Sequence, residues 1–175
     1  MNEVKVERDV VYSIAEGYWA EAPDSFWRRT MLLFRRSGAL RPIELKMDIY
    51  MPADDHGARR PLLLMLHGGS YLFGHKTEAG QAEWCRYFAS LGYVAASIDY
   101  RLGFHLDKDD FSRAEKQAVE DAENALGYLL GRADLLIDAG EVFLAGTSAG
   151  AAVSLFMAYR LATARILQLR TMSDL

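Results

Sequence analysis

Residues 146–150 read Gly-Thr-Ser-Ala-Gly, directly after the apolar run 142–145 and directly before a long helix-forming stretch. A serine on a sharp strand-to-helix turn is held in a strained backbone conformation, so its neighbours must lack side chains if the strand and helix are to pass closely. Gly146 and Gly150 flank Ser148 in this way. The arrangement predicts that Ser148 is a nucleophile, against the alternative of a chance cluster of small residues in a turn.

A second glycine-rich loop follows another apolar strand pattern, at 61–66, and reads His67-Gly68-Gly69-Ser70. Acyl transfer places negative charge on the carbonyl oxygen of the substrate, and backbone N–H groups of such a loop can approach closely enough to stabilise it. The alternative is an ordinary turn at the end of a strand. Because two such loops each end an apolar strand, the sequence favours a site for acyl transfer.

On these residues, and on the Asp-Tyr-Arg-Leu run at 99–102, the chain resembles α/β-hydrolase-fold serine carboxylesterases of the hormone-sensitive-lipase-like and related bacterial esterase groups. The resemblance runs from about residue 43 to the end of the helix that follows Ser148. It implies that Ser148 is the nucleophile and that main-chain N–H groups form the oxyanion hole. The residues that it assigns to the oxyanion hole are Gly68, Gly69, Ser70 and Ala149, and His67 supports their loop.

The chain departs from this family at two places. Ser70 stands where the family usually has a third glycine, but the donor is a backbone group, so the serine preserves it. The family's triad runs in the order serine, acid, histidine, whereas no histidine follows Ser148 and the one acid there is Asp174. The base and its orienting acid are therefore absent from their expected places.

The chain has four histidines, and none of them replaces the missing base convincingly. His67 belongs to the glycine loop, while His56 and His75 are predicted to lie in solvent. His105 is the single candidate for a displaced base, because it follows a strand that ends at the same sheet edge as Ser148. No histidine and acid show metal-ligand spacing and Cys85 is alone, so neither a metal nor another cofactor is predicted.

Hydrophobic periodicity places the motifs in an α/β fold. Strand patterns lie near 4–12, 44–50, 62–66, 94–99 and 141–145, and helical patterns lie near 78–91, 112–131 and 149–166. Their alternation predicts parallel β-α-β units after an antiparallel hairpin, which is the amino-terminal half of an α/β-hydrolase three-layer sandwich with a mostly parallel sheet. We expect one truncated domain over 1–175, with an insertion or long hairpin at 17–42.

Truncation would leave the strand at 142–145 on an edge of the sheet. The family's last three strands have no counterpart in this chain, and Val-Phe-Leu-Ala carries neither charge nor proline to block pairing with another strand. We therefore expect self-association, aggregation or dependence on a partner segment.

Charged residues near the motifs are interpreted as structural. Asp121 lies in a predicted helix where the family often places a loop-bracing aspartate, and Asp99 with Arg101 is expected to brace loops as well. The net charge of −4 gives no field that attracts phosphates, so nucleic-acid binding is not predicted.

Neither a signal peptide nor a membrane span is expected. The uncharged stretch 142–159 divides into strand and helix, and the amino end lacks an apolar signal core. The default location is the cytoplasm, although a removed export signal would leave no trace in this sequence.

Two functions follow from the sequence. The first is a serine hydrolase that acts on small carboxylic esters through an acyl-enzyme on Ser148, impaired because the acid and histidine are absent. The second is a non-catalytic remnant or binding module of the α/β-hydrolase fold.

Overall fold

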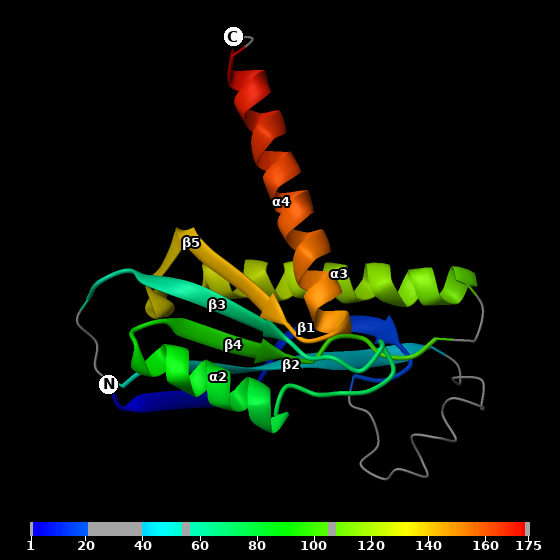
Figure 1. Cartoon of the computed structure of the whole chain (residues 1–175), viewed down its shortest axis with the longest axis horizontal. Coiled ribbons are helices and arrows are strands. Elements are labelled where there is room, and N and C mark those ends of the chain that lie inside the picture. Colours follow the sequence, from blue (N-terminus) through cyan, green and yellow to red (C-terminus); the bar gives the residue numbers. More distant parts are fainter. Residues whose placement is uncertain (1, 21–39, 54–56, 105–107, 174–175) are drawn as a thin grey trace.

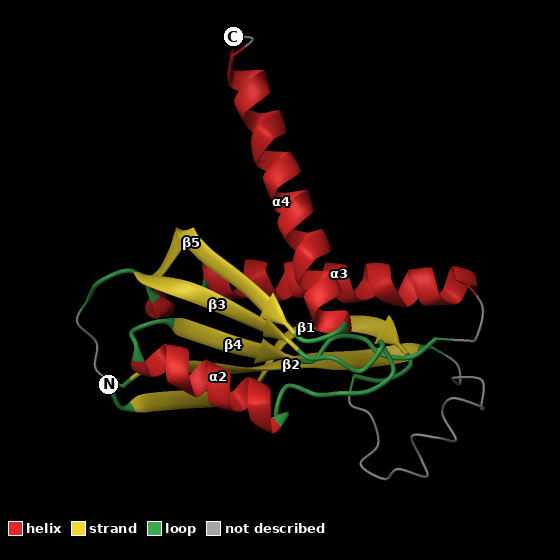
Figure 2. Cartoon of the chain, in the orientation of Figure 1, coloured by secondary structure: helices red, strands yellow, loops and turns green. Residues whose placement is uncertain are grey.

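A computed structural model describes residues 2–20, 40–53, 57–104 and 108–173. In chain order the elements are β1 (Val4–Gly17), β2 (Arg41–Pro52), β3 (Arg60–Leu66), α2 (Ala79–Ser90), β4 (Val94–Ile98), α3 (Lys108–Gly131), the short 3-10 helix η1 (Ala133–Leu135), β5 (Ile137–Gly146) and α4 (Ala149–Ser173). Figure 2 shows the strands as one layer between helices, which confirms the predicted α/β class.

The sheet has the strand order β1-β2-β4-β3-β5. β1 pairs with β2 and β2 with β4 in the antiparallel sense, whereas β3 lies parallel to both β4 and β5. The antiparallel hairpin therefore precedes a parallel β-α-β region, as the sequence predicted. β5 lies at one edge of the described sheet, next to β3, which also agrees with the prediction (Figure 1).

Two hydrophobic clusters hold the helices on opposite faces of the sheet. The side chains of β3 alternate between the two faces of the sheet, and helices cover both faces, so the strand is buried on both sides. Leu62, Leu64 and Leu66 pack with residues of α3 and α4. Leu63 and Met65 pack against Cys85 and Ala89 of α2 on the other face. A strand covered on both sides reads as a continuous apolar run, which is the pattern seen at 62–66.

Element ends differ from the sequence expectation where local pattern gives no signal. β1 continues to Gly17, whereas the sequence predicted that it would end near residue 12. Two register shifts in its pairing with β2 interrupt the alternation that marks a strand, so the pattern did not reveal the second part of β1. Asp9, at the first shift, has a φ of +56°. α3 starts at Lys108 and α4 continues to Ser173, so both are longer than expected.

The prediction for residues 17–42 falls mostly on 21–39, which lie outside the described residues. Gly17 ends β1 and Arg41 begins β2, so this segment joins the two strands of the hairpin. Within the described part of the chain, none of the helices has the length and apolar character needed to cross a membrane.

A buried ion cluster joins the antiparallel hairpin to the loop that follows β3. The ammonium group of Lys76 lies 2.9 Å from the carboxylate of Asp48, which is fully buried on β2. It also lies 2.8 Å from the carboxylate of Asp9 on β1, and Arg8 approaches Asp48 at 3.2 Å. Burial opposes the charge on Lys76, but the carboxylates outweigh it and raise the pKa of the ammonium.

Lys76→Met should lower the free energy of unfolding by about 3 kcal/mol, because it leaves the buried carboxylate of Asp48 without its nearest cation. The exposed Lys5 pairs with Glu7 at 3.6 Å, so Lys5→Met should change stability by less than about 0.5 kcal/mol. Urea unfolding followed by circular dichroism measures both effects. Lys76→Met/Asp48→Leu should recover at least half of the loss, and a Lys76→Met variant as stable as the parent would contradict this role.

Candidate active site

Ser148 lies at the bend between β5 and α4, with its side chain exposed to solvent rather than turned into the core. Its φ is +50°, in the left-handed region that non-glycine residues rarely occupy. Such a conformation costs about 1–3 kcal/mol and persists only where surrounding structure imposes it. The strained turn expected from the sequence is therefore present, and it presents the hydroxyl at the surface.

The surroundings that impose this bend are backbone atoms, packed too closely to admit side chains. A Cβ on Gly150 would lie 2.2 Å from the carbonyl oxygen of Leu66 and 2.5 Å from that of His67. A Cβ on Gly146 would lie 2.4 Å from the carbonyl carbon of Gly150. The two glycines thus allow the start of α4 to cross the end of β3, as the pattern indicated.

The glycine loop after β3 lies directly beside the bend. A Cβ on Gly68 would lie 3.0 Å from the carbonyl oxygen of Thr147 and 3.4 Å from the Cβ of Ser148. Gly69 has a φ of +114°, and its carbonyl accepts hydrogen bonds from the N–H groups of Leu72 and Phe73, both at 2.9 Å. The two loops that the sequence singled out therefore meet at Ser148.

The backbone turns sharply at the next two loop residues as well. Ser70 and Tyr71 have φ values of +53° and +61°, which is unusual for two consecutive non-glycine residues. The turn bonds of the loop use the carbonyl of Gly69 and the N–H groups after Tyr71. The N–H groups of Gly69 and Ser70 take no part in those turn bonds.

Ala149 is the first residue of α4, so its N–H has no carbonyl partner within the helix. The amino end of a helix also carries a partial positive charge. Ser148 thus stands immediately before a backbone donor in a region that favours an anion. Together with the adjacent glycine loop, the bend can hold an oxygen anion next to the serine hydroxyl.

His67 serves the loop and forms no hydrogen bond with Ser148. Its imidazole is fully buried and stacks on Tyr100, with the ring centroids 4.2 Å apart. Its Nδ1 donates to the carbonyl of Gly68 at 2.7 Å, and the hydroxyl of Tyr100 donates to the carbonyl of His67 at 2.7 Å. Burial lowers the pKa of His67 from 6.5 to about 4, so the ring is neutral near pH 7.

The described residues bring no imidazole into hydrogen-bond contact with Ser148. His75 accepts hydrogen bonds at Nδ1 from the backbone N–H and the hydroxyl of Thr77, at 3.3 and 2.6 Å. His105, the predicted displaced base, and His56 both lie outside the described residues. Over that same part of the chain, no group of histidine, cysteine and acidic side chains could hold a metal ion.

Asp121 and Asp99 hold neighbouring loops. The buried Asp121 accepts hydrogen bonds from the backbone N–H of Arg101 at 2.8 Å and from its Nε at 2.9 Å. Asp99 accepts from the backbone N–H of Lys76 at 2.6 Å. These contacts fix the chain after β4 to α3 and fix the far end of the glycine loop to β4.

Sequence reasoning missed the contribution of Lys76. Its ammonium group and backbone connect the glycine loop to β1, β2 and β4. A single lysine after a glycine loop carries no recognisable pattern, because its partners are 67 and 28 positions away in the chain, at Asp9 and Asp48. A contact of that kind emerges only from the folded structure.

The BD-FAE family matches the chain over residues 47–171. Among curated proteins, the non-reducing polyketide synthase ausA of Emericella nidulans is 33% identical over 135 residues, which are 75% of this chain and 5% of the synthase. The non-reducing polyketide synthase Preu6 of Preussia isomera is 32% identical over 158 residues, covering 88% of this chain and 7% of the synthase. The chain thus spans less than a tenth of either synthase.

Solved structures of two bacterial esterases share this fold. Esterase 2 of Thermogutta terrifontis, phosphorylated by paraoxon, superposes with a TM-score of 0.57 and 25% identity, over 85% of this chain and 45% of the esterase. Esterase B of Lactobacillus rhamnosis, inhibited by a tributyrin phosphonate, superposes with a TM-score of 0.52 and 23% identity, over 84% of this chain and 37% of the esterase. The chain therefore spans less than half the length of these esterases.

Gly150→Ala should destabilise the fold by about 1–3 kcal/mol, because the added methyl group meets two backbone carbonyls that cannot rotate away. Gly127→Ala is the matched control, since it lies inside α3 and its Cβ would meet nothing within 4 Å. That control should stabilise the protein by about 0.5–1 kcal/mol. Thermal unfolding distinguishes the two, and equal effects would contradict the close crossing at the bend.

The buried neutral His67 should make stability depend on pH between about 4 and 6.5. The unfolded chain binds a proton at this residue near pH 6.5 and the folded chain near pH 4, so stability is full above this window and falls as the pH is lowered through it. The loss should reach about 3 kcal/mol, at about 1.4 kcal/mol for each pH unit between the two values. His67→Gln should flatten this dependence in urea titrations, and an unchanged slope would rule the assignment out.

Proposed function

The chain belongs to the BD-FAE family of esterase-like α/β hydrolases, and from this premise we propose that it carries the nucleophile and oxyanion-binding loop of a serine hydrolase that acts on carboxylic esters. The observation that carries the proposal is the exposed Ser148, with a φ of +50°, placed against the glycine loop. Strained residues of this kind concentrate at catalytic sites.

The chemistry proposed for this site is acyl transfer. The hydroxyl oxygen of Ser148 attacks the ester carbonyl carbon, and the carbonyl oxygen becomes an anion in the tetrahedral intermediate. N–H groups of Gly69, Ser70 and Ala149, with Gly68 beside them, would donate to that oxygen. Expulsion of the alcohol leaves an acyl-enzyme, and water then releases the acid and restores the serine.

This cycle requires a base that takes the serine proton and later activates water. His67 is unsuited to that task, because its Nδ1 is engaged with the carbonyl of Gly68 and burial lowers the pKa of its ring to about 4. A serine without its base is a weak nucleophile. We therefore propose that the chain supplies the nucleophile and the anion-binding groups. Turnover then depends on a base that lies outside the described residues.

The paraoxon adduct of Thermogutta terrifontis esterase 2 supports the choice of reaction. Organophosphorus reagents imitate the charge and geometry of an acyl-transfer intermediate, so they react where a serine and an anion-binding loop are aligned. By analogy with that esterase, Ser148 is the expected point of attack in this chain.

The second candidate is a non-catalytic binding module, favoured by the lack of an imidazole next to Ser148 among the described residues. Matches to segments of polyketide synthases are compatible with an accessory role inside a larger assembly. In a well-studied serine protease, removal of the triad leaves about 10³–10⁴-fold acceleration over water from the oxyanion hole and binding. An accessory module would retain binding without covalent chemistry.

Treatment with a fluorophosphonate probe followed by intact-mass measurement tests the proposal. We expect one probe to add to the folded chain at Ser148, slowly because no base assists the hydroxyl. Ser148→Ala should abolish the adduct. Ser70→Ala should keep it, because the proposed donor at that position is the backbone N–H and an alanine retains it.

A folded chain that takes up no probe during prolonged incubation would refute the nucleophile and favour the binding module. An adduct that persists in Ser148→Ala would also refute it, since another residue would then be the reactive group. Circular dichroism on each variant establishes that the chain under test is folded.

A further inference from the structure

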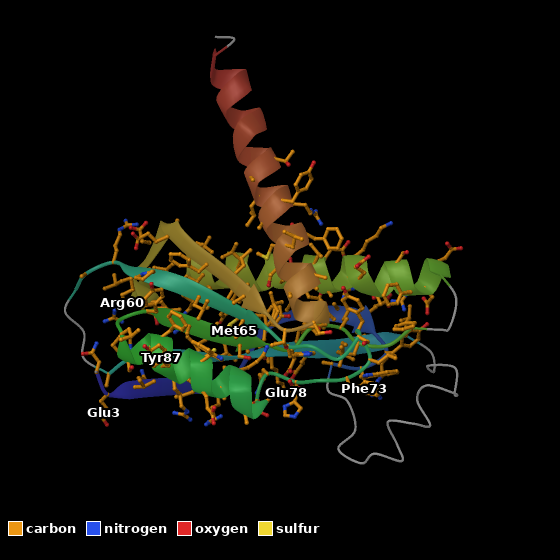
Figure 3. All side chains as sticks on the ribbon, in the orientation of Figure 1. Glu3, Arg60, Met65, Phe73, Glu78 and Tyr87 are labelled. Atoms are coloured by element: carbon orange, nitrogen blue, oxygen red, sulfur yellow. The ribbon has the colours of Figure 1, made fainter. Side chains whose placement is uncertain are left out.

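The glycine loop after β3 lies against the chain segment that follows β4. Residues 67–76 contain the loop, and we call residues 99–103 the β4 extension. Figure 3 shows Phe73, in the loop, beyond the end of the sheet at which β3 and β4 terminate. Because these two strands are parallel neighbours in the sheet, the segments that leave them begin side by side. The β4 extension can therefore contact the loop at more than one point.

Two adjacent residues of the β4 extension bind the two ends of the loop. The hydroxyl of Tyr100 donates to the carbonyl of His67 at 2.7 Å, and the two rings stack at an interplanar angle of 10°. The carboxylate of Asp99 accepts a hydrogen bond from the backbone N–H of Lys76 at 2.6 Å. Tyr100 and Asp99 are both buried, so water does not compete for these bonds.

A third hydrogen bond holds the middle of the loop. The N–H of Gly103 donates to the carbonyl of Tyr71 at 2.8 Å. Gly103 has a φ of +101°, and a Cβ at this position would lie 2.7 Å from the ring of Trp19. The indole N–H of Trp19 donates to the carbonyl of Leu72 at 3.4 Å. The middle of the loop is thereby bonded both to the backbone of the β4 extension and to an indole ring packed against it.

The β4 extension is itself fixed to α3 and so gives the loop a rigid support. Asp121, buried on α3, accepts hydrogen bonds from the backbone N–H and the Nε of Arg101, at 2.8 and 2.9 Å. The guanidinium of Arg113, also on α3, donates to the carbonyl of Gly103 at 3.1 Å. Because the extension is bonded to a helix as well as to the loop, it fixes the loop relative to the core.

The carbonyl of His67 is the point at which these contacts reach Ser148. The hydroxyl of Tyr100 binds this oxygen, and a Cβ on Gly150, at the start of α4, would lie 2.5 Å from the same atom. One residue further along the loop, a Cβ on Gly68 would lie 3.4 Å from the Cβ of Ser148. The carbonyl of His67 and the N–H of Gly68 belong to one planar peptide unit, so a rotation of that carbonyl reorients the loop where it meets the serine.

We propose that Tyr100 is a positioning residue for the reaction at Ser148, a role that rests on the proposed function. Its hydroxyl holds the carbonyl of His67 and thereby sets where the following N–H groups of the loop lie relative to the serine. Without the hydroxyl, the loop can adopt positions in which those N–H groups no longer converge on the substrate oxygen. A displacement of about 1 Å at a reacting centre lowers a rate by about 100-fold.

Tyr100→Phe tests the proposal, because it removes the hydroxyl and keeps the ring that stacks on His67. Tyr12→Phe is the matched control. The hydroxyl of the buried Tyr12 also donates to a backbone carbonyl at 2.7 Å, but its acceptor is Asp99, outside the loop and held as well by its N–H in the pairing with β2. Each variant loses one buried hydrogen bond, so thermal unfolding should show similar decreases in melting temperature for the two.

Reaction with a fluorophosphonate probe over a concentration series separates reversible binding of the probe from bond formation at Ser148. Tyr100→Phe should lower the maximal rate of adduct formation at least about tenfold. The half-saturating probe concentration should change by less than about threefold, because the loop N–H groups act mainly on the charge of the transition state. Tyr12→Phe should react like the parent. A Tyr100→Phe variant that reacts as fast as the parent, or an equal slowing in both variants, would overturn the proposal.

Amide hydrogen exchange followed by NMR tests the same contact without any reaction at Ser148. The N–H groups of Lys76 and Gly103 donate in bonds between the loop and the β4 extension, so their exchange rates report local opening there. Tyr100→Phe should accelerate their exchange at least about tenfold more than Tyr12→Phe does. If the parent takes up no probe, the proposed function fails and the exchange rates alone decide. Faster exchange confined to Tyr100→Phe then supports its hold on the loop, and equal exchange in the two variants overturns it.

Discussion

The candidate site depends on one close contact of backbone with backbone, where the beginning of α4 crosses the end of β3. Gly146 and Gly150 have no side chains there, and a methyl group on Gly150 would lie 2.2 Å from the carbonyl oxygen of Leu66. This contact forces the turn between the two glycines into a tight path. Ser148 consequently takes a φ of +50° and stands exposed beside the glycine loop. Packing of the core thus imposes the strained backbone conformation of Ser148.

The glycine loop is held at both ends by buried polar contacts, so its position relative to Ser148 is determined by the sheet. At its start, the ring of His67 stacks on that of Tyr100, and the carbonyl of His67 accepts a hydrogen bond from the Tyr100 hydroxyl. At its end, Lys76 joins Asp48 on the antiparallel hairpin and Asp99 after β4. The hairpin therefore contributes to the site although it contains no proposed catalytic residue. Preorganised donors are effective because they need not move when charge develops.

Local patterns were sufficient to predict the strands and the strand-to-helix bend, because each depends on residues close in sequence. The meeting of the two loops was expected only from the family resemblance, since about 78 positions separate them in the chain. The edge position of β5 was expected because the family's last three strands have no counterpart in this sequence. The cluster around Lys76 could not be predicted in this way, since it joins β1, β2 and a loop through long-range contacts. The length of β1 was underestimated for a related reason, because its register shifts break the alternation by which a strand is recognised.

We propose that the backbone around Ser148 is arranged to hold an oxygen anion. A crystal structure of the chain after reaction with an organophosphate ester tests it most directly, because the phosphoryl oxygen occupies the place of that anion. We expect phosphorus bonded to the oxygen of Ser148, with the phosphoryl oxygen about 2.7–3.1 Å from the N–H nitrogens of Ala149 and of Gly69 or Ser70. A phosphoryl oxygen that points into solvent, with those N–H groups directed elsewhere, would contradict it.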